Sequence, residues 1–162
     1  MIFPAKHGAL AMLALLIALP GLAQDAPAPI TVDLGDVYAD SLGSEGLHAY
    51  TMELESGYFV FGAVNQITVD VVVTVKDPEG EQVGEFDIPA RGAEPFQFTT
   101  ETAGAYRFEV TPFEEETGRY EFTLQLVEPE ATTPAGKVDQ VMSQYGDETP
   151  GTVVAIVRDG EV

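Results

Sequence analysis

The 162-residue sequence contains no cysteine and no tryptophan, and it has only 7 Lys and Arg against 27 Asp and Glu. The absence of Cys excludes disulfides, a thiol nucleophile, Cys-ligated zinc or iron–sulfur sites and a lipid-modified N-terminal Cys. The formal net charge of -20 argues against nucleic acid and anionic lipid as partners, because both need clusters of Lys and Arg. A hydrophobic fraction of 45% is nevertheless typical of a chain that folds.

Residues 1–23 have the pattern of a secretory signal peptide. A short polar start with Lys6 precedes the uncharged apolar run Ala9–Leu19, and small residues stand in front of a cleavage site after Ala23. The run is shorter than the roughly 20 apolar residues of a membrane-spanning helix. We therefore expect an exported protein, periplasmic or extracellular, that keeps no membrane anchor after cleavage.

A Pro- and Ala-rich linker, 24–29, leads into a region with an apolar period of two, which is typical of strands with one buried face. Clear alternation is found in Tyr50–Leu54, Val69–Lys76, Tyr106–Val110 and Tyr120–Leu126. Further candidate strands are Tyr58–Val64, Val83–Ile88 and the short Phe96–Phe98. Turn signals separate these stretches. Residues 30–128 are thus predicted to be an all-β domain, an antiparallel sandwich or jelly roll of seven to eight strands.

The aromatic residues of this region lie mostly on the predicted inward faces, which favours a core role over a ligand platform. Two successive stretches, starting at Gly104 and Gly118, both read Gly-x-Tyr-x-apolar-x-apolar. A Gly turn that leads twice into a Tyr-led strand predicts a terminal hairpin. With these Gly and Tyr spacings, residues 30–128 resemble the bacterial pre-peptidase C-terminal domain family. The resemblance implies a β-sandwich accessory module of an exported hydrolase, with no catalysis of its own.

The acidic residues offer one candidate metal site. Asp33, Asp36, Asp40 and Glu45 lie around the first predicted turn, and residues 114–116 form a Glu run. Calcium needs several oxygen ligands that converge, but no Asp-x-Asp-x-Asp-Gly loop is present. We therefore interpret the acidity as a solvated surface that keeps an exported protein soluble, and we predict no metal and no cofactor.

The C-terminal stretch changes period. After a linker, 129–135, apolar residues at Val138, Val141, Met142 and Tyr145 predict an amphipathic helix. Pro150-Gly151, the apolar run Val153–Val157 and an Asp159-Gly160 turn come after it. Residues 136–162 are too few for a core of their own, so we expect them to begin a larger domain that is truncated here. The alternative is a short arm that packs back on the sandwich.

This stretch resembles the start of the serine β-lactamase-like family, which includes class C β-lactamases, DD-peptidases and esterases. The resemblance is carried by the helix, Pro150-Gly151, the strand Thr152–Val157 and the turn Arg158–Val162. It implies a Ser-x-x-Lys nucleophile acting on a β-lactam, a peptidoglycan peptide or an ester. No such motif occurs here, because the tetrads that begin at Ser41, Ser44, Ser56 and Ser143 all lack the Lys.

The sequence therefore predicts no catalytic, cofactor-binding or metal-ligating residue in this chain. His48 is the only His after the signal peptide, and nothing in the sequence singles out a Ser and an Asp to complete a triad with it. Two functions remain open. The chain is either the N-terminal part of an exported β-lactamase-related serine hydrolase, or a complete, non-catalytic, secreted binding or adhesion module.

Overall fold

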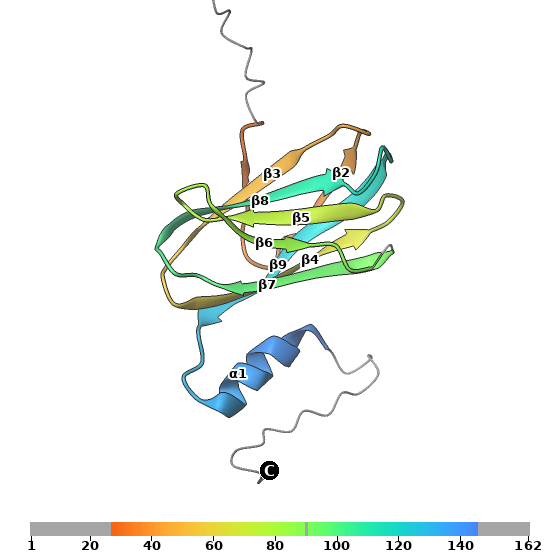
Figure 1. Ribbon diagram of the computed structural model, residues 1–162. Helices are drawn as coiled ribbons and strands as arrows, with labels where there is room; N and C mark the ends of the chain where they lie inside the picture. The colour runs from red at the N-terminus through yellow and green to blue at the C-terminus, as the bar shows by residue number, and fades with distance from the viewer. Residues whose placement is uncertain (1–26, 90, 146–162) are drawn as a thin grey trace, which may run out of the picture.

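The computed structural model describes residues 27–89 and 91–145, and it is a β-sandwich followed by a short helix (Figure 1). The described residues form nine strands: β1 (Ile30–Thr31), β2 (Tyr38–Leu42), β3 (His48–Leu54), β4 (Tyr58–Gln66), β5 (Val71–Lys76), β6 (Gln82–Phe86), β7 (Gly92–Thr99), β8 (Gly104–Pro112) and β9 (Gly118–Pro129). Helix α1 (Pro134–Val141) and a 3-10 turn (Met142–Gln144) complete them.

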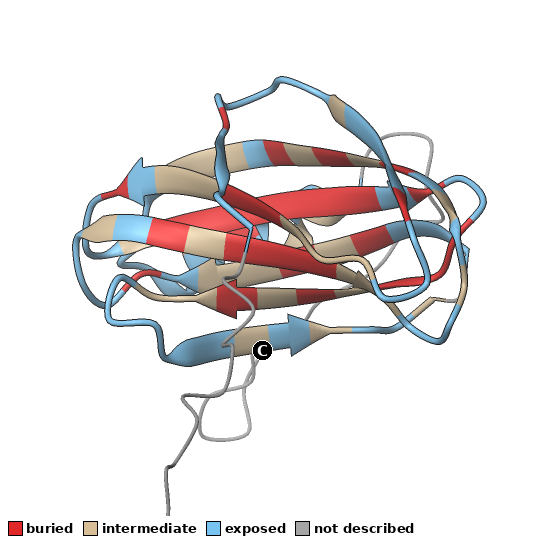
Figure 2. Ribbon diagram, turned by 90° about the horizontal axis from the view of Figure 1, so that it is seen from above, coloured by how far each residue is buried: buried red, intermediate tan, exposed pale blue. Residues whose placement is uncertain are grey.

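Two sheets face each other across the core. One has the order β1-β3-β8-β5-β6 and the other the order β2-β9-β4-β7. The strand pairs are antiparallel except β1 and β3, which are parallel. Buried residues lie in the middle of the strands, between the sheets (Figure 2). The all-β sandwich predicted from the alternating pattern is therefore confirmed.

The alternation identifies the core residues correctly. Every second residue of β5, from Val71 to Val75, is fully buried, and so are Phe108 and Phe122 on β8 and β9. Aromatic rings from the two sheets meet in this core, with 5.7 Å between the ring centroids of Phe108 and Phe122. The core role predicted for the aromatic residues agrees with this packing.

The structure adds two strands to the prediction, β1 and β2. Both are short, and only Leu42 of their residues is buried, so neither has the apolar alternation that a sequence pattern needs. Each lies at the edge of its sheet. At the opposite edge, β6 ends at Phe86, two residues before the predicted Ile88, which is 80% exposed.

The predicted terminal hairpin of β8 and β9 is wrong. β8 pairs with β3 and β5, whereas β9 pairs with β2 and β4, so the two strands belong to different sheets. Residues 113–117 carry the chain from one sheet to the other. The repeated Gly-x-Tyr pattern arises because both strands lie inside their sheets and face the same core, not because they pair.

A bulge in β9 redirects its last residues. Phe61 pairs with Leu126 and Gly62 pairs with Leu124, which leaves Gln125 as the extra residue. The expected alternation therefore ends at Leu124. Val127, in place of Leu126, packs against the core, and Leu126 lies on the opposite face.

β4 is buried on both faces. Val60 and Val64 belong to the core cluster, and a Cβ at Gly62 would lie 2.3 Å from the ring of Phe96, so these residues point inward. Phe59 and Phe61, each 5% exposed, alternate with them and point to the outer face. This outer face is the one on which Leu126 lies next to the C-terminal helix.

Helix α1 begins at Pro134, not at the predicted Val138, and ends at Val141. Thr133 caps it by accepting a hydrogen bond from the Gly136 N–H at 3.1 Å, and Pro134 provides the first helical residue. A Thr followed by Pro is a helix-start signal, but a Pro- and Thr-rich stretch also has the composition of a linker, which hides the signal.

Several predictions fall outside the described residues, namely the signal peptide at 1–23, Pro150-Gly151, the strand Thr152–Val157 and the Asp159-Gly160 turn. Within residues 27–89 and 91–145, no helix is both long and apolar enough to cross a bilayer.

The close approach of the Phe96 ring of β7 to the backbone of β4 at Gly62 is testable. We expect Gly62→Ala to lower the free energy of unfolding by about 1–3 kcal/mol, because its methyl group would overlap the Phe96 ring and the Thr123 carbonyl. Gly43→Ala is the matched control, since a Cβ there meets nothing within 4 Å. Urea denaturation of both variants measures the difference, and equal stabilities would contradict the packing described.

Candidate functional site

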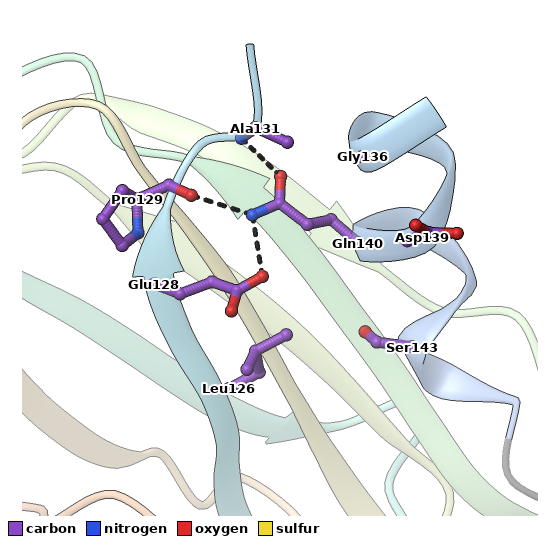
Figure 3. Close-up of a pocket in the computed structure, with 8 residues that line it drawn as sticks. All are labelled: Leu126, Glu128, Pro129, Ala131, Gly136, Asp139, Gln140 and Ser143. Atoms are coloured by element: carbon purple, nitrogen blue, oxygen red, sulfur yellow. Dashed lines mark hydrogen bonds between the residues drawn. The ribbon is translucent and has the colours of Figure 1, made fainter. Parts of the chain in front are cut away.

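Gln140 is the buried polar side chain that attaches the C-terminal helix to the sandwich (Figure 3). Its Nε2 donates hydrogen bonds to Glu128 Oε1 at 2.8 Å and to the Pro129 carbonyl at 2.9 Å, and its Oε1 accepts one from the Ala131 N–H at 2.8 Å. Gln140 is only 6% exposed, and no other residue of α1 is buried. The amide therefore uses both donors and its acceptor to hold the helix on the end of β9.

Two further contacts fix the same junction. Lys137 Nζ lies 2.6 Å from Glu130 Oε1, and the Glu130 N–H donates to the Gly57 carbonyl at 2.8 Å. A groove of about 380 Å³ remains between β9 and α1, lined by Leu126, Glu128, Pro129, Ala131, Gly136, Asp139, Gln140 and Ser143. The helix is thus held to the strand end by hydrogen bonds and an ion pair, beside a groove with both polar and apolar lining residues.

The apolar residues of α1 lie on the side away from Gln140. Val138 precedes Gln140 by two residues, and two residues turn a helix by roughly 200°. Val138, Val141 and Met142 line a shallow apolar hollow of about 220 Å³ together with Lys137. We call Val138, Val141 and Met142 the apolar patch; within it Val141 is 43% exposed.

His48 belongs to a second polar cluster, at the other end of the sandwich core. Its Nδ1 lies 2.6 Å from the Tyr120 hydroxyl and 3.4 Å from Asp40 Oδ2, and the Tyr50 hydroxyl lies 2.6 Å from that of Tyr120. Burial raises the pKa of both tyrosines. The hydrogen bond between the two tyrosine hydroxyls joins the two sheets here, because Tyr50 lies on β3 and Tyr120 on β9.

This cluster does not have the geometry of a catalytic triad. Asp40 and Tyr120 both approach the same ring nitrogen of His48, whereas a triad needs the base and the orienting carboxylate on different nitrogens. In the described residues no Ser side chain is hydrogen-bonded to His48. The geometry of His48 is therefore that of a structural residue.

The structure does not bring the candidate metal ligands together. The Asp33 N–H donates a hydrogen bond to the Tyr38 hydroxyl, the Asp36 carbonyl accepts one from the Thr123 hydroxyl, and the Glu116 carboxylate accepts one from the Asp70 N–H. In the part of the chain that the structure describes, no three His, Asp or Glu side chains form a group that could hold a metal ion.

A fully buried carboxyl group lies on β7. Glu94 Oε2 accepts a hydrogen bond from the Ile88 N–H at 2.8 Å, while its Oε1 has no hydrogen-bond partner. Burial raises the pKa of Glu94, and the nearby charges of Asp87 and Asp70 raise it further. Sequence reasoning missed this residue, because a Glu in an edge strand is normally exposed.

Glu109 shows the opposite balance. Burial acts to raise its pKa, but hydrogen bonds from Lys76 and Arg107 outweigh burial and lower it. The carboxylate is held by Lys76 Nζ at 2.8 Å and by Arg107 Nε at 2.7 Å. Glu109 is therefore stabilised in its charged form, whereas Glu94 is stabilised in its neutral form.

Comparison with solved structures supports the fold. The chain is similar to the pre-peptidase C-terminal domain of a collagenase from Bacillus anthracis, with a TM-score of 0.50 and 14% identity over 62% of this chain and 97% of that one. The chain is also similar to PliG, a periplasmic inhibitor of g-type lysozyme, from two organisms. For the Aeromonas hydrophila protein the TM-score is 0.48, with 14% identity over 60% of this chain and 96% of that one. For the Salmonella Typhimurium protein the TM-score is 0.47, with 15% identity over 63% of this chain and 100% of that one.

No family model and no curated protein matches the chain. The likeness to the collagenase domain confirms the pre-peptidase C-terminal type of β-sandwich predicted from the Gly and Tyr spacings, at the level of the fold. The resemblance to β-lactamase-like proteins rests on residues 136–162 and stays a prediction.

The role of Gln140 can be tested by a substitution of similar size. We expect Gln140→Leu to leave the Ala131 N–H and Glu128 unpaired and to loosen α1, so that amide hydrogen exchange in Lys137–Val141 accelerates by about ten- to a hundredfold. Gln144→Leu is the control, because the Gln144 side chain, in the 3-10 turn, donates only to the Val141 carbonyl at the end of α1. Equal exchange in both variants would contradict the docking role.

The two buried carboxyl groups predict opposite pH effects on stability. Because folding raises the pKa of Glu94, the folded state of the natural chain loses stability as the pH rises through that raised pKa. We therefore expect Glu94→Gln to become more stable relative to the natural chain as the pH rises. Because folding lowers the pKa of Glu109, its carboxylate stabilises the folded state at pH values above the unfolded pKa. We therefore expect Glu109→Gln to lower the stability at neutral pH, and to lower it less in acid. Urea denaturation across a pH series measures both, and effects of the same sign would refute the assignment.

Proposed function

We propose that this β-sandwich is an exported accessory module that precedes a β-lactamase-related serine hydrolase domain. In this proposal residues 1–23 direct export, and residues 136–162 are the first part of the hydrolase domain. The nucleophile and its base lie in the polypeptide after Val162. The parent enzyme performs acyl transfer through a Ser acyl-enzyme on a β-lactam, a peptidoglycan peptide or an ester.

The observation that carries this proposal is the way α1 is attached. A short arm that ended the protein would gain most by burying its apolar side on the sandwich, since burial of apolar area is the dominant gain in packing. Instead α1 buries only Gln140 against β9 and leaves Val141 43% exposed. The helix is fixed in place by its polar side and keeps its apolar patch for another element, which supports a continuing domain.

The sandwich itself supports an accessory role. Its polar clusters around Glu109, Glu94 and His48 join strands to each other or lie inside the fold, and none combines a nucleophile with a base. The net charge of -20 favours solubility outside the cytoplasm.

The second candidate is a non-catalytic binding module. It is supported by a cleft of about 520 Å³ near the free edges of β6 and β7, whose lining includes Phe98, Tyr106, Asp77 and Glu101 but no Lys or Arg. Such a lining suits a ligand with a positive charge, such as an ammonium group of a peptide.

The coding sequence downstream of the Val162 codon distinguishes the two candidates. We expect an open frame that reaches a Ser-x-x-Lys motif, and hydrolysis of nitrocefin or a p-nitrophenyl ester only by the protein that includes this continuation. Ser→Ala in that motif should abolish turnover. A stop codon directly after Val162, or turnover by purified residues 24–162, would instead overturn the proposal.

A further inference from the structure

The cleft between β6 and β7 lies where both sheets end. β6 is the last strand of one sheet and β7 is the last strand of the other. The cleft has a volume of about 520 Å³, and its lining includes Gln82 and Val83 of β6 and Gln97, Phe98 and Thr99 of β7. A volume of this size is typical of ligand sites in proteins.

The backbone of β7 is hydrogen-bonded on one side only. The Thr100 N–H donates to the Tyr58 carbonyl at 2.8 Å, so these two residues form a hydrogen-bonded pair that continues the β4–β7 ladder. In an antiparallel ladder such pairs alternate with residues whose N–H and C=O point away from the partner strand. Thr99 and Gln97 lie at the alternate positions. Their backbone groups therefore point away from β4, at the free edge of its sheet.

These edge groups are unpaired within residues 27–89 and 91–145, since β4 is the only strand beside β7 there. Gln97 adds a side-chain acceptor, because its Oε1 is buried and has no hydrogen-bond partner. Pro95, the next residue in the same alternation, has no N–H. The run of free donors that an added strand could use therefore ends at Gln97 and coincides with the lining of the cleft.

The rest of the lining suits a Lys or Arg side chain. Phe98 is half-buried, with its ring 5.5 Å from that of Tyr106 between centroids, and Val83 is 44% exposed. These residues offer apolar contact to the aliphatic part of a long basic side chain. Asp77 and Glu101 also line the cleft, whereas no Lys or Arg does. The two carboxylates attract the positive charge at the end of such a side chain.

We propose that this cleft binds an extended, basic segment of another polypeptide, which adds to the edge of β7 as a further strand. The backbone of the segment pairs with Gln97 and Thr99, and a Lys or Arg side chain reaches Asp77 and Glu101. In strand addition, main-chain hydrogen bonds provide affinity and side-chain pockets provide specificity.

The charge of the chain favours a basic partner over a second copy of itself. Two molecules with a formal net charge of -20 repel each other, whereas a basic segment is attracted. The site lies wholly on the sandwich. The proposal therefore does not depend on a hydrolase domain, and it deepens the second candidate function by giving the binding module its class of ligand.

Amide hydrogen exchange of the natural chain tests the added strand directly. The probe is the synthetic peptide acetyl-Val-Lys-Val-Lys-Val-amide, and the same peptide with Glu in place of Lys is its control. We expect the Lys peptide to slow exchange of the Gln97 and Thr99 amides by about tenfold or more, because an N–H that enters a ladder is protected. The amide of Ala93 also points away from β4 but lies outside the cleft, so its exchange stays unchanged.

Two pairs of variants locate the site by the affinity of the labelled Lys peptide, measured by fluorescence polarisation. Gln97→Pro removes an N–H that the fold does not use, and we expect about tenfold weaker binding or less. Ala93→Pro makes the same change outside the cleft and leaves the affinity unchanged. Glu101→Gln removes one carboxylate of the cleft, and we expect about three- to tenfold weaker binding. Glu45→Gln, in the exposed turn between β2 and β3, changes the net charge equally and leaves the affinity unchanged.

Four results would overturn the inference. They are equal binding of the Lys and Glu peptides, binding that leaves exchange of Gln97 and Thr99 unchanged, an equal loss of affinity in a variant and its matched control, and protection of the two amides that rises with the concentration of the chain alone, which would identify a second copy as the occupant. Urea denaturation reports whether each variant is folded, and the exchange measurement needs no variant.

The outcome is separate from that of the hydrolase proposal. A chain that binds neither peptide refutes the peptide site and leaves the hydrolase proposal untouched. A stop codon directly after Val162 refutes the hydrolase proposal and leaves the peptide site standing.

Discussion

The stacking of aromatic rings around Phe122 is the contact on which the rest of the fold depends. Its ring lies 4.3 Å from that of Tyr50 and 5.7 Å from those of Phe96 and Phe108, measured between centroids, so it joins residues of both sheets. Gly62 lets the Phe96 ring approach the backbone of β4. Because the two sheets are closed by this cluster, β9 is held in register, and its last residues reach the point where α1 is attached.

Local patterns predicted the faces of the strands and could not predict their partners. The period of two in β5 and β8 is a property of a few consecutive residues, so Val73 and Phe108 were recognised as core. β8 and β9 pair with strands that are distant in the sequence, and these pairings depend on which sheet each strand enters. The apolar alternation within a strand carries no information about that choice. The short, exposed β2 has no alternation to detect.

The site was predicted less well than the fold, because its central residues contradict the average behaviour of their type. Gln140 is polar and buried, and Glu94 is a buried acid with one unpaired oxygen. The helical stripe of Val138 and Val141 was recognised, but a stripe indicates an apolar side and not the surface that this side contacts. The three hydrogen bonds of Gln140 show that the sandwich contacts the opposite, polar side of α1.

The polar attachment has a consequence for how the module is oriented. Apolar contacts are non-directional and tolerate sliding, whereas the amide of Gln140 requires two acceptors and one donor at fixed positions on β9 and the residues after it. A joint made this way sets the angle of α1 relative to the sandwich. The sandwich and α1 therefore keep a defined orientation to each other, which a flexible linker alone would not provide.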